Sequence, residues 1–217
     1  MKITARLFCL MVFALLAATP CLGIIAVTWL DSPIILQSPL LPIYNAVDMN
    51  GDSIIDITFL VNGHFVGARA EGANQYLIWP SGGSNIGGDI EPLLDAFEIG
   101  PNSGDDSWMD WFGDGEGFGN LIICLEGSGG YTCVGRFAGQ HAYMGVEFDI
   151  EGATHYGWID LLVASGNPYA EIYGWGYETD PGVSILAGAG AVPEPGTSIL
   201  IGMGLLCLIR KRSKPRS

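Results

Sequence analysis

Residues 142–164 read AYMGVEFDIEGATHYGWIDLLVA. Two runs in this stretch, 142–150 and 154–164, alternate between apolar and polar side chains, and Glu151-Gly152 lies between them. Alternation with a period of two is typical of a strand with one buried face, and an acidic residue followed by glycine is typical of a tight hairpin turn. The stretch therefore predicts an antiparallel β-hairpin.

Shorter apolar runs of the same kind extend over the whole middle of the chain. They predict further strands at 24–30, 54–61, 64–69, 75–79, 121–126, 130–137, 169–179 and 183–186. Asn62-Gly63 favours a type I′ hairpin turn, while Pro33, Pro39 and Pro42 predict a loop or an edge segment. No stretch of twelve or more residues between the termini has a persuasive helical period. The expected fold is all-β: a single antiparallel β-sandwich, jelly-roll-like, over residues 24–190.

The N-terminal residues have a different composition from this predicted domain. Lys2 and Arg6 precede an apolar run at 7–18, and small or helix-breaking residues follow it up to Gly23. A basic start, a short apolar run and a small-residue exit are the pattern of a secretory signal peptide. We expect residues 1–23 to be this signal and the mature chain to begin near Ile24.

Charge is distributed very unevenly along the chain. Between Arg6 and Arg210 there are two basic residues, Arg69 and Arg136, no lysine and all 23 acidic residues, which gives a formal charge of −21. Nucleic acids and anionic membrane surfaces require a basic protein face, so they are excluded as partners. Divalent cations, a hydrated polymer matrix and simple solubility are all compatible with this charge.

Four oxygen-bearing side chains, Asp48, Asn50, Asp52 and Asp56, occupy positions 1, 3, 5 and 9 of DMNGDSIID. This spacing can bring oxygens together around Ca²⁺, the only cofactor that the sequence indicates. The segment differs from an EF-hand because Ser53 replaces the expected glycine and a strand follows in place of a helix. A calcium loop and a metal-free turn held by Asx hydrogen bonds remain the two alternatives.

Two cysteines of the predicted domain lie in LIICLEGSGGYTCVGRF, residues 121–137. If Ser128-Gly129 forms a two-residue hairpin loop, counting outward places Cys124 opposite Cys133 in a non-hydrogen-bonded pair. That short separation suits a structural disulfide in an exported protein, and two buried free thiols are the alternative.

Trp108 and Trp111 lie among carboxylates in DDSWMDWFGDGE, residues 105–116. Exposed, the two indoles would stack on sugar rings; buried, they would fill the core. The chain has no G-x-S-x-G, H-E-x-x-H or P-loop motif, and its three histidines are far apart in the sequence. We predict no catalytic residues and no enzyme activity, with a glycosidase carboxylate pair as the remaining enzymatic alternative.

The last 27 residues, 191–217, form a segment with three parts. These are Val192-Pro193-Glu194-Pro195, an apolar stretch at 196–209, and a basic tail at 210–217 that starts with Arg210-Lys211-Arg212. The apolar stretch predicts a short transmembrane helix. At about 1.5 Å per residue it covers roughly 21 Å, less than the hydrocarbon core of about 30 Å, and the basic tail would hold it at the cytoplasmic side. Such a span fits a temporary anchor.

These three parts, in this order after a signal peptide, resemble the PEP-CTERM sorting signal. The resemblance implies a Gram-negative bacterium, a precursor held transiently in the inner membrane, and an exosortase that acts near Pro193–Pro195. Residues 155–188 and the segment VDMNGDSIIDITF also resemble domains often found before this signal. We therefore expect a structural protein of the cell surface or of an exopolysaccharide biofilm matrix. The alternatives are a carbohydrate-binding module that contacts this exopolysaccharide and, more remotely, a polysaccharide hydrolase.

Overall fold

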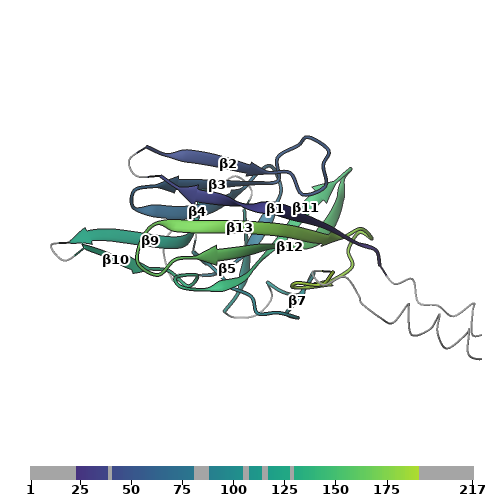
Figure 1. Ribbon diagram of the computed structural model, residues 1–217. Helices are drawn as coiled ribbons and strands as arrows, with labels where there is room; N and C mark the ends of the chain where they lie inside the picture. The colour runs from purple at the N-terminus through teal and green to yellow at the C-terminus, as the bar shows by residue number, and fades with distance from the viewer. Residues whose placement is uncertain are drawn as a thin grey trace, which may run out of the picture.

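The computed structural model describes residues 23–38, 41–80, 88–104, 108–113, 117–127 and 130–190. These residues form fourteen strands and contain no helix (Figure 1), so the predicted all-β fold is confirmed. No helix able to span a membrane was found in these ranges. The predicted signal peptide, the helix at 196–209 and the rest of the sorting segment lie outside the described residues.

The strands vary from two to thirteen residues in length. In chain order they are β1 (Ile25–Gln37), β2 (Ile43–Val47), β3 (Ile57–Asn62), β4 (Phe65–Ala70), β5 (Gln75–Trp79), β6 (Asp89–Ile90), β7 (Glu98–Ile99), β8 (Asp110–Gly113), β9 (Gly119–Gly127), β10 (Gly130–Val134), β11 (His141–Ile150), β12 (Ala153–Val163), β13 (Tyr169–Glu178) and β14 (Ile185–Leu186).

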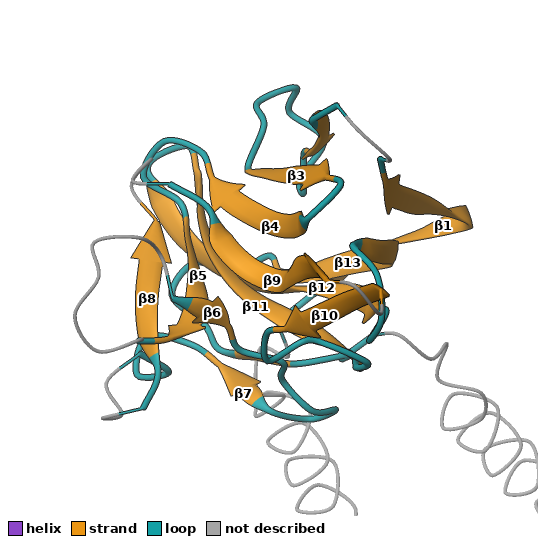
Figure 2. Cartoon of the chain, turned by 90° about the vertical axis from the view of Figure 1, so that its left-hand side faces the viewer, coloured by secondary structure: helices purple, strands orange, loops and turns teal. Residues whose placement is uncertain are grey.

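Twelve strands belong to one continuous sheet. Its order is β1-β13-β12-β11-β5-β6-β9-β4-β3-β2, with β10 beside β9 and β8 beside β5, whereas β7 and β14 form a separate pair. Figure 2 shows this sheet curving strongly from β8 and β5 through β11 and β12. It folds over far enough for β1 and β3 to come into contact, so the sandwich is made by a single, nearly closed sheet. All its strand pairs are antiparallel except β6 with β9.

The hairpin expected at residues 142–164 is present as β11 and β12. The strands pair from Ile150 with Ala153 to His141 with Leu162. Glu151 and Gly152 have φ angles of 55° and 86°, as a type I′ turn requires. The Asp149 carboxylate also accepts a hydrogen bond from the backbone N–H of Gly152 at 2.9 Å. Turn chemistry and side-chain alternation therefore agree on one register.

Two apolar clusters lie on opposite faces of β12. The main core fills the inside of the folded sheet and includes Ile159 and Leu161. On the outer face, Tyr156 and Trp158 pack with Leu77 and with residues from the β7–β14 region. Because both faces are covered, β12 is buried almost throughout, whereas its sequence pattern alone predicts one exposed face.

Several shorter elements differ from the sequence-based expectation. Pro33 lies within the edge strand β1, at the point where the pairing of β1 with β13 is irregular, between Trp29 and Ile34. An edge position tolerates proline because its N–H is not needed for the sheet. The β3–β4 loop is Gly63-His64, one residue later than expected, because Asn62 pairs with Phe65 and its side chain accepts from the His64 N–H at 2.9 Å.

The two ends of the described domain lie side by side. The backbone N–H of Thr179 donates to the carbonyl of Ile24 at 3.0 Å. A side chain at Gly190, which has a φ of +77°, would come within 2.7 Å of Val27 on β1. The chain therefore enters and leaves the described domain at the same edge, beside β1.

Candidate functional site

The larger of two adjoining cavities, here the aromatic pocket, has a volume of about 480 Å³. Its lining combines two indole rings with aliphatic side chains and one ion pair: Trp79, Glu91, Pro92, Leu93, Leu94, Phe97, Trp108, Met109 and Arg136. They come from the end of β5, the segment after β6, the approach to β8 and the turn after β10. The volume and the mainly apolar lining are typical of small-ligand sites.

Two tryptophans form the aromatic wall of this pocket. The rings of Trp79 and Trp108 meet edge to face, with centroids 6.4 Å apart and planes at 85°. Trp108 is 56% exposed and Leu94 is 76% exposed, so both present apolar surface at the mouth. Covering such surface with a ligand is favourable because apolar area is removed from water.

Arg136 lies over the ring of Trp79. Its guanidinium carbon lies 4.3 Å from the centroid of the Trp79 ring, a cation–π geometry. The guanidinium also donates two hydrogen bonds to the Glu91 carboxylate, through Nε and through Nη2, the latter at 2.9 Å. The hydrogen bonds that Arg136 donates to Glu91 raise the pKa of the guanidinium above its usual value. The pocket thus contains a fixed, internally neutralised ion pair.

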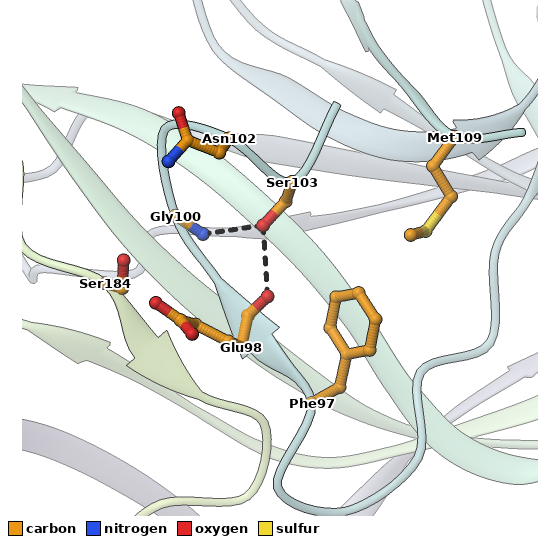
Figure 3. Close-up of a pocket in the computed structure, with 7 residues that line it drawn as sticks. All are labelled: Phe97, Glu98, Gly100, Asn102, Ser103, Met109 and Ser184. Carbon is orange, nitrogen blue, oxygen red and sulfur yellow. Dashed lines mark hydrogen bonds between the residues drawn. The ribbon is translucent and has the colours of Figure 1, made fainter. Parts of the chain in front are cut away.

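The second cavity, here the polar pocket, has a volume of about 220 Å³ (Figure 3). Its lining is Phe97, Glu98, Gly100, Asn102, Ser103, Met109 and Ser184. Ser103 holds the turn, because its Oγ accepts from the Gly100 N–H at 2.9 Å and donates to the Glu98 carbonyl at 3.0 Å. Phe97 and Met109 line both cavities, so the two pockets adjoin.

The structure separates the two tryptophans that the sequence placed together. Trp108 lines the aromatic pocket, whereas Trp111 lies on β8 and packs 6.0 Å from the ring of Tyr156 in the outer apolar cluster. Trp111 lines neither pocket, and its indole nitrogen is buried. Sequence reasoning missed Trp79 and Arg136, although Arg136 is one of only two basic residues between Arg6 and Arg210.

The loop proposed for calcium is held together by hydrogen bonds to its own backbone. The two carboxylate oxygens of Asp48 accept from the N–H groups of Gly51 and Ser53, each at 2.7 Å. Asp52 accepts from the Ile54 N–H at 2.7 Å and from the Asn50 side chain at 2.9 Å. These are the contacts of consecutive Asx turns.

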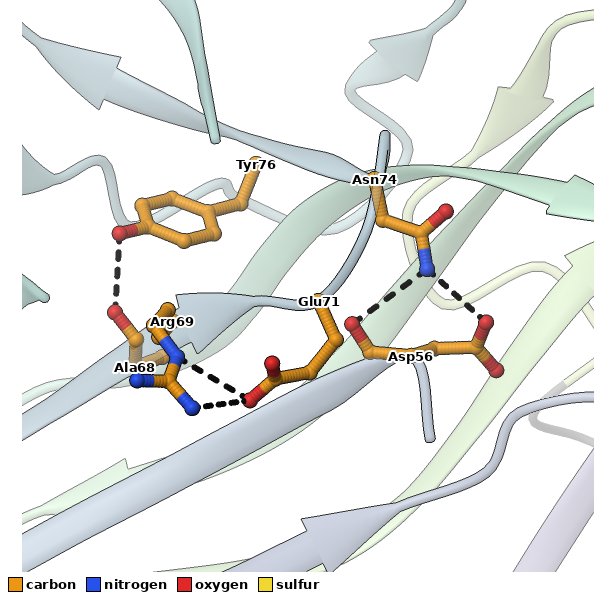
Figure 4. A network of polar contacts seen from close by, with 6 residues as sticks. All are labelled: Asp56, Ala68, Arg69, Glu71, Asn74 and Tyr76. Carbon is orange, nitrogen blue, oxygen red and sulfur yellow. Dashed lines mark hydrogen bonds and ion pairs between the residues drawn. The ribbon is translucent and has the colours of Figure 1, made fainter. Parts of the chain in front are cut away.

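Asp56, the fourth residue of the set, directly precedes β3 and is only 3% exposed. Its carboxylate accepts from the Met49 N–H at 2.8 Å. It also accepts from the Asn74 amide at 3.0 Å, as Figure 4 shows. Burial raises its pKa to about 6. The described ranges contain no group of three or more His, Cys, Asp or Glu side chains placed to hold a metal ion. Calcium binding here stays a prediction.

Cys124 and Cys133 form a disulfide across β9 and β10, with their Cα atoms 4.0 Å apart. The register runs from Gly127 with Gly130 to Cys124 with Cys133, as expected for a two-residue loop. Cys124 is fully buried in the main core, so the bond links β10 to a core position of β9.

Comparison with known proteins identifies only the end of the chain. Residues 191–213 match the family model of the PEP-CTERM protein-sorting motif. The chain carries a PEP-CTERM sorting motif. No curated protein and no solved structure matches the chain significantly.

The PEP-CTERM match includes the residues on which the resemblance was based: Val192, Pro193, Glu194, Pro195, Arg210, Lys211 and Arg212. The motif implies export, a membrane-anchored precursor and an exosortase as processing partner. In this PEP-CTERM protein the sorting motif begins directly after Gly190, the residue that packs against β1. Processing there would release the domain from its anchor at one edge and leave both pockets unaltered.

Proposed function

We propose that this PEP-CTERM protein is a structural component of the cell surface or exopolysaccharide biofilm matrix of a Gram-negative bacterium. The observation that carries the proposal is the sorting motif at residues 191–213 behind an acidic all-β domain. A formal charge of −21 between Arg6 and Arg210 keeps such a domain soluble and hydrated outside the cell. The Cys124–Cys133 disulfide suits the same oxidising environment.

A structural role is also favoured over a catalytic one because buried carboxylates of the domain accept hydrogen bonds from neighbouring protein groups. Asp56 accepts hydrogen bonds from Met49 and Asn74, and Asp160 accepts from His141. Neither carboxylate lines one of the two pockets. Glu91, which does, is engaged by Arg136 through two hydrogen bonds. Glycoside hydrolysis requires two carboxylates facing one cleaved bond. Of these three carboxylates, only Glu91 lines a pocket.

Replacement of Pro193, Glu194 and Pro195 by alanine in the native host tests the sorting step. We expect the wild-type protein in the surface or matrix fraction and the triple variant in the inner membrane at precursor mass. Thr197→Ala, in the adjacent apolar stretch, is the matched control and should be sorted normally. A triple variant that still reaches the surface would count against exosortase-dependent sorting.

Deletion of the gene tests the structural role itself. A matrix component should leave the polysaccharide yield unchanged while lowering the cohesion of the biofilm, and the wild-type gene should restore cohesion. Unchanged cohesion in the deletion strain would count against the structural role.

A carbohydrate-binding module is the second candidate function, and one observation favours it. The exposed ring of Trp108 stands beside a fixed ion pair in a cavity of about 480 Å³. This pocket is therefore the candidate sugar-binding site of the domain.

A further inference from the structure

We propose that the aromatic and polar pockets form one groove that binds a segment of a neutral polysaccharide. The inference relies on the extracellular location given in the proposed function, but not on the structural role. The proposal assigns a ligand class and contact residues to the β domain. The sorting motif itself carries no information about what this domain binds.

Continuity of the two cavities is the first step. Phe97 and Met109 contribute to both linings, so the two pockets lie next to each other, within reach of one extended ligand. The cavities measure about 480 Å³ and 220 Å³. A site with an apolar part and an adjoining polar part suits a chain of rings that extends over both better than it suits a single compact molecule.

Trp108 provides the stacking surface in this groove. Its ring is more than half exposed, yet its position is fixed by edge-to-face contact with Trp79. Trp79 is fixed in turn by the Arg136 guanidinium, which lies over its ring. Sugar rings have one face of C–H groups, and these bear partial positive charge that complements the negative face of an indole. A rigid, exposed indole is therefore a good platform for such a ring.

Electrostatics select a neutral ligand. Arg136 supplies the only positive charge in either lining, and Glu91 neutralises it. Asp89 lies close enough to act on the same guanidinium, and Glu98 adds negative charge to the polar pocket. Nucleic acid bases also stack on tryptophan, but phosphate or uronate polymers would meet repulsion from these acids and from the charge of −21.

Hydroxyl groups would find hydrogen-bond partners at both ends of the groove. The Glu91–Arg136 pair uses two of the five N–H groups of the guanidinium, which leaves donors for ligand oxygens. In the polar pocket, Glu98, Asn102 and Ser184 supply a carboxylate, an amide and a hydroxyl. Figure 3 shows these polar groups on the side opposite Phe97 and Met109. Affinity should therefore increase when the ligand is long enough to reach them.

The test is calorimetric titration of the mature protein from its native host with sugars of defined length. The neutral probes are glucose, mannose, cellohexaose and mannohexaose, and the acidic probe is a guluronate hexamer. We expect a neutral hexasaccharide to bind with a Kd below about 1 mM and at least about tenfold more tightly than its single sugar. The guluronate hexamer should bind more weakly than the neutral one.

Two tryptophan variants locate the binding. Trp108→Ala should weaken binding of the neutral hexasaccharide by about tenfold or more, as loss of an aromatic anchor does, and should keep the melting temperature because the ring is exposed. Trp29→Ala is the matched control: Trp29 is 44% exposed but lines neither pocket. It should leave the Kd unchanged. Ser184→Ala should weaken the hexasaccharide and not the single sugar.

Any of three binding results would overturn the proposal. They are no binding by either neutral hexasaccharide, tighter binding of the guluronate hexamer, or equal effects of Trp108→Ala and Trp29→Ala. A concentration-dependent dimer that Trp108→Ala abolishes would assign the groove to a second copy of the chain and would also overturn it. A surface-located protein that fails to bind sugars refutes only the groove, whereas a sugar-binding protein retained in the inner membrane refutes only the proposed function.

Discussion

Asp48 is the residue on which the loop at 48–56 depends most directly. Its two oxygens accept from the N–H groups of Gly51 and Ser53, and both donors have positive φ angles. Asp48→Ala leaves these two donors without their partner. We predict a loss of about 1–3 kcal/mol in the free energy of unfolding, measured by denaturant titration in EGTA.

The same variant distinguishes the turn from a calcium site. Asn62→Ala is the control, because it removes a comparable Asx contact, to His64, outside the loop. If the hydrogen bonds dominate, Asp48→Ala costs the same in EGTA and in calcium. A cost that appears only in calcium, together with a rise in wild-type melting temperature on adding the ion, would show that the loop binds the metal.

Residue-scale prediction from sequence reaches its limit at Trp108 and Trp111. Both indoles lie among acids, and composition does not distinguish an exposed ring from a buried one. Their spacing carries some information, because residues three apart on an extended chain point to opposite faces. The structure follows this rule, with Trp108 in the aromatic pocket and Trp111 in the outer cluster. Trp79 and Arg136 join Trp108 only through tertiary folding, so no local pattern identified them.

At the scale of elements, the β9–β10 hairpin offers the clearest prediction. The Cys124–Cys133 bond closes a ring of about ten residues, and such a loop is stabilised by about 2–3 kcal/mol in the chain-entropy model. Reduction, or replacement of both cysteines by alanine, should lower the free energy of unfolding by that amount. The measurement is a denaturant titration with and without dithiothreitol.

The cysteine-free variant is also the control for this hairpin experiment, since dithiothreitol should leave its stability unchanged. Equal stability of the oxidised and reduced wild-type protein would contradict the prediction. It would mean that the β9–β10 pairing holds the hairpin without the bond.

Elements with a strong local signal could be predicted from the sequence. The turn at Glu151-Gly152 and the two-residue loop between Gly127 and Gly130 each determine a register without information from the rest of the chain. The sequence predicts strand β12 but not its burial on both faces. Its outer face is covered by residues of the β7–β14 region, which are distant in the sequence. The short strands β6 and β7, two residues each, have too little pattern to be recognised.

At the scale of the whole molecule, the order of the strands was not predictable. Hairpins join neighbours in sequence, but β1 pairs with β13, β5 with β11 and β4 with β9. These pairings depend on which sheet edges meet once the main core has formed, and alternation along a single strand does not encode that choice. The sandwich was expected as a class, whereas its construction from one folded sheet was not.

The two ends of the chain connect this fold to its cellular route. Ile24 and Gly190 lie at the same edge of the domain, so the chain leaves the domain there both toward the predicted signal peptide and toward the sorting motif that starts at residue 191. Removal of both segments would leave the folded sheet and the proposed groove intact. The proposed export route therefore predicts where the mature chain begins and ends.

The intact mass of the protein recovered from the cell surface or matrix of its native host tests this central claim most directly. We predict a chain that lacks the signal peptide and ends near Pro193–Pro195, without the apolar stretch and the basic tail. A surface protein whose mass still includes every residue to Ser217 would contradict sorting by exosortase processing.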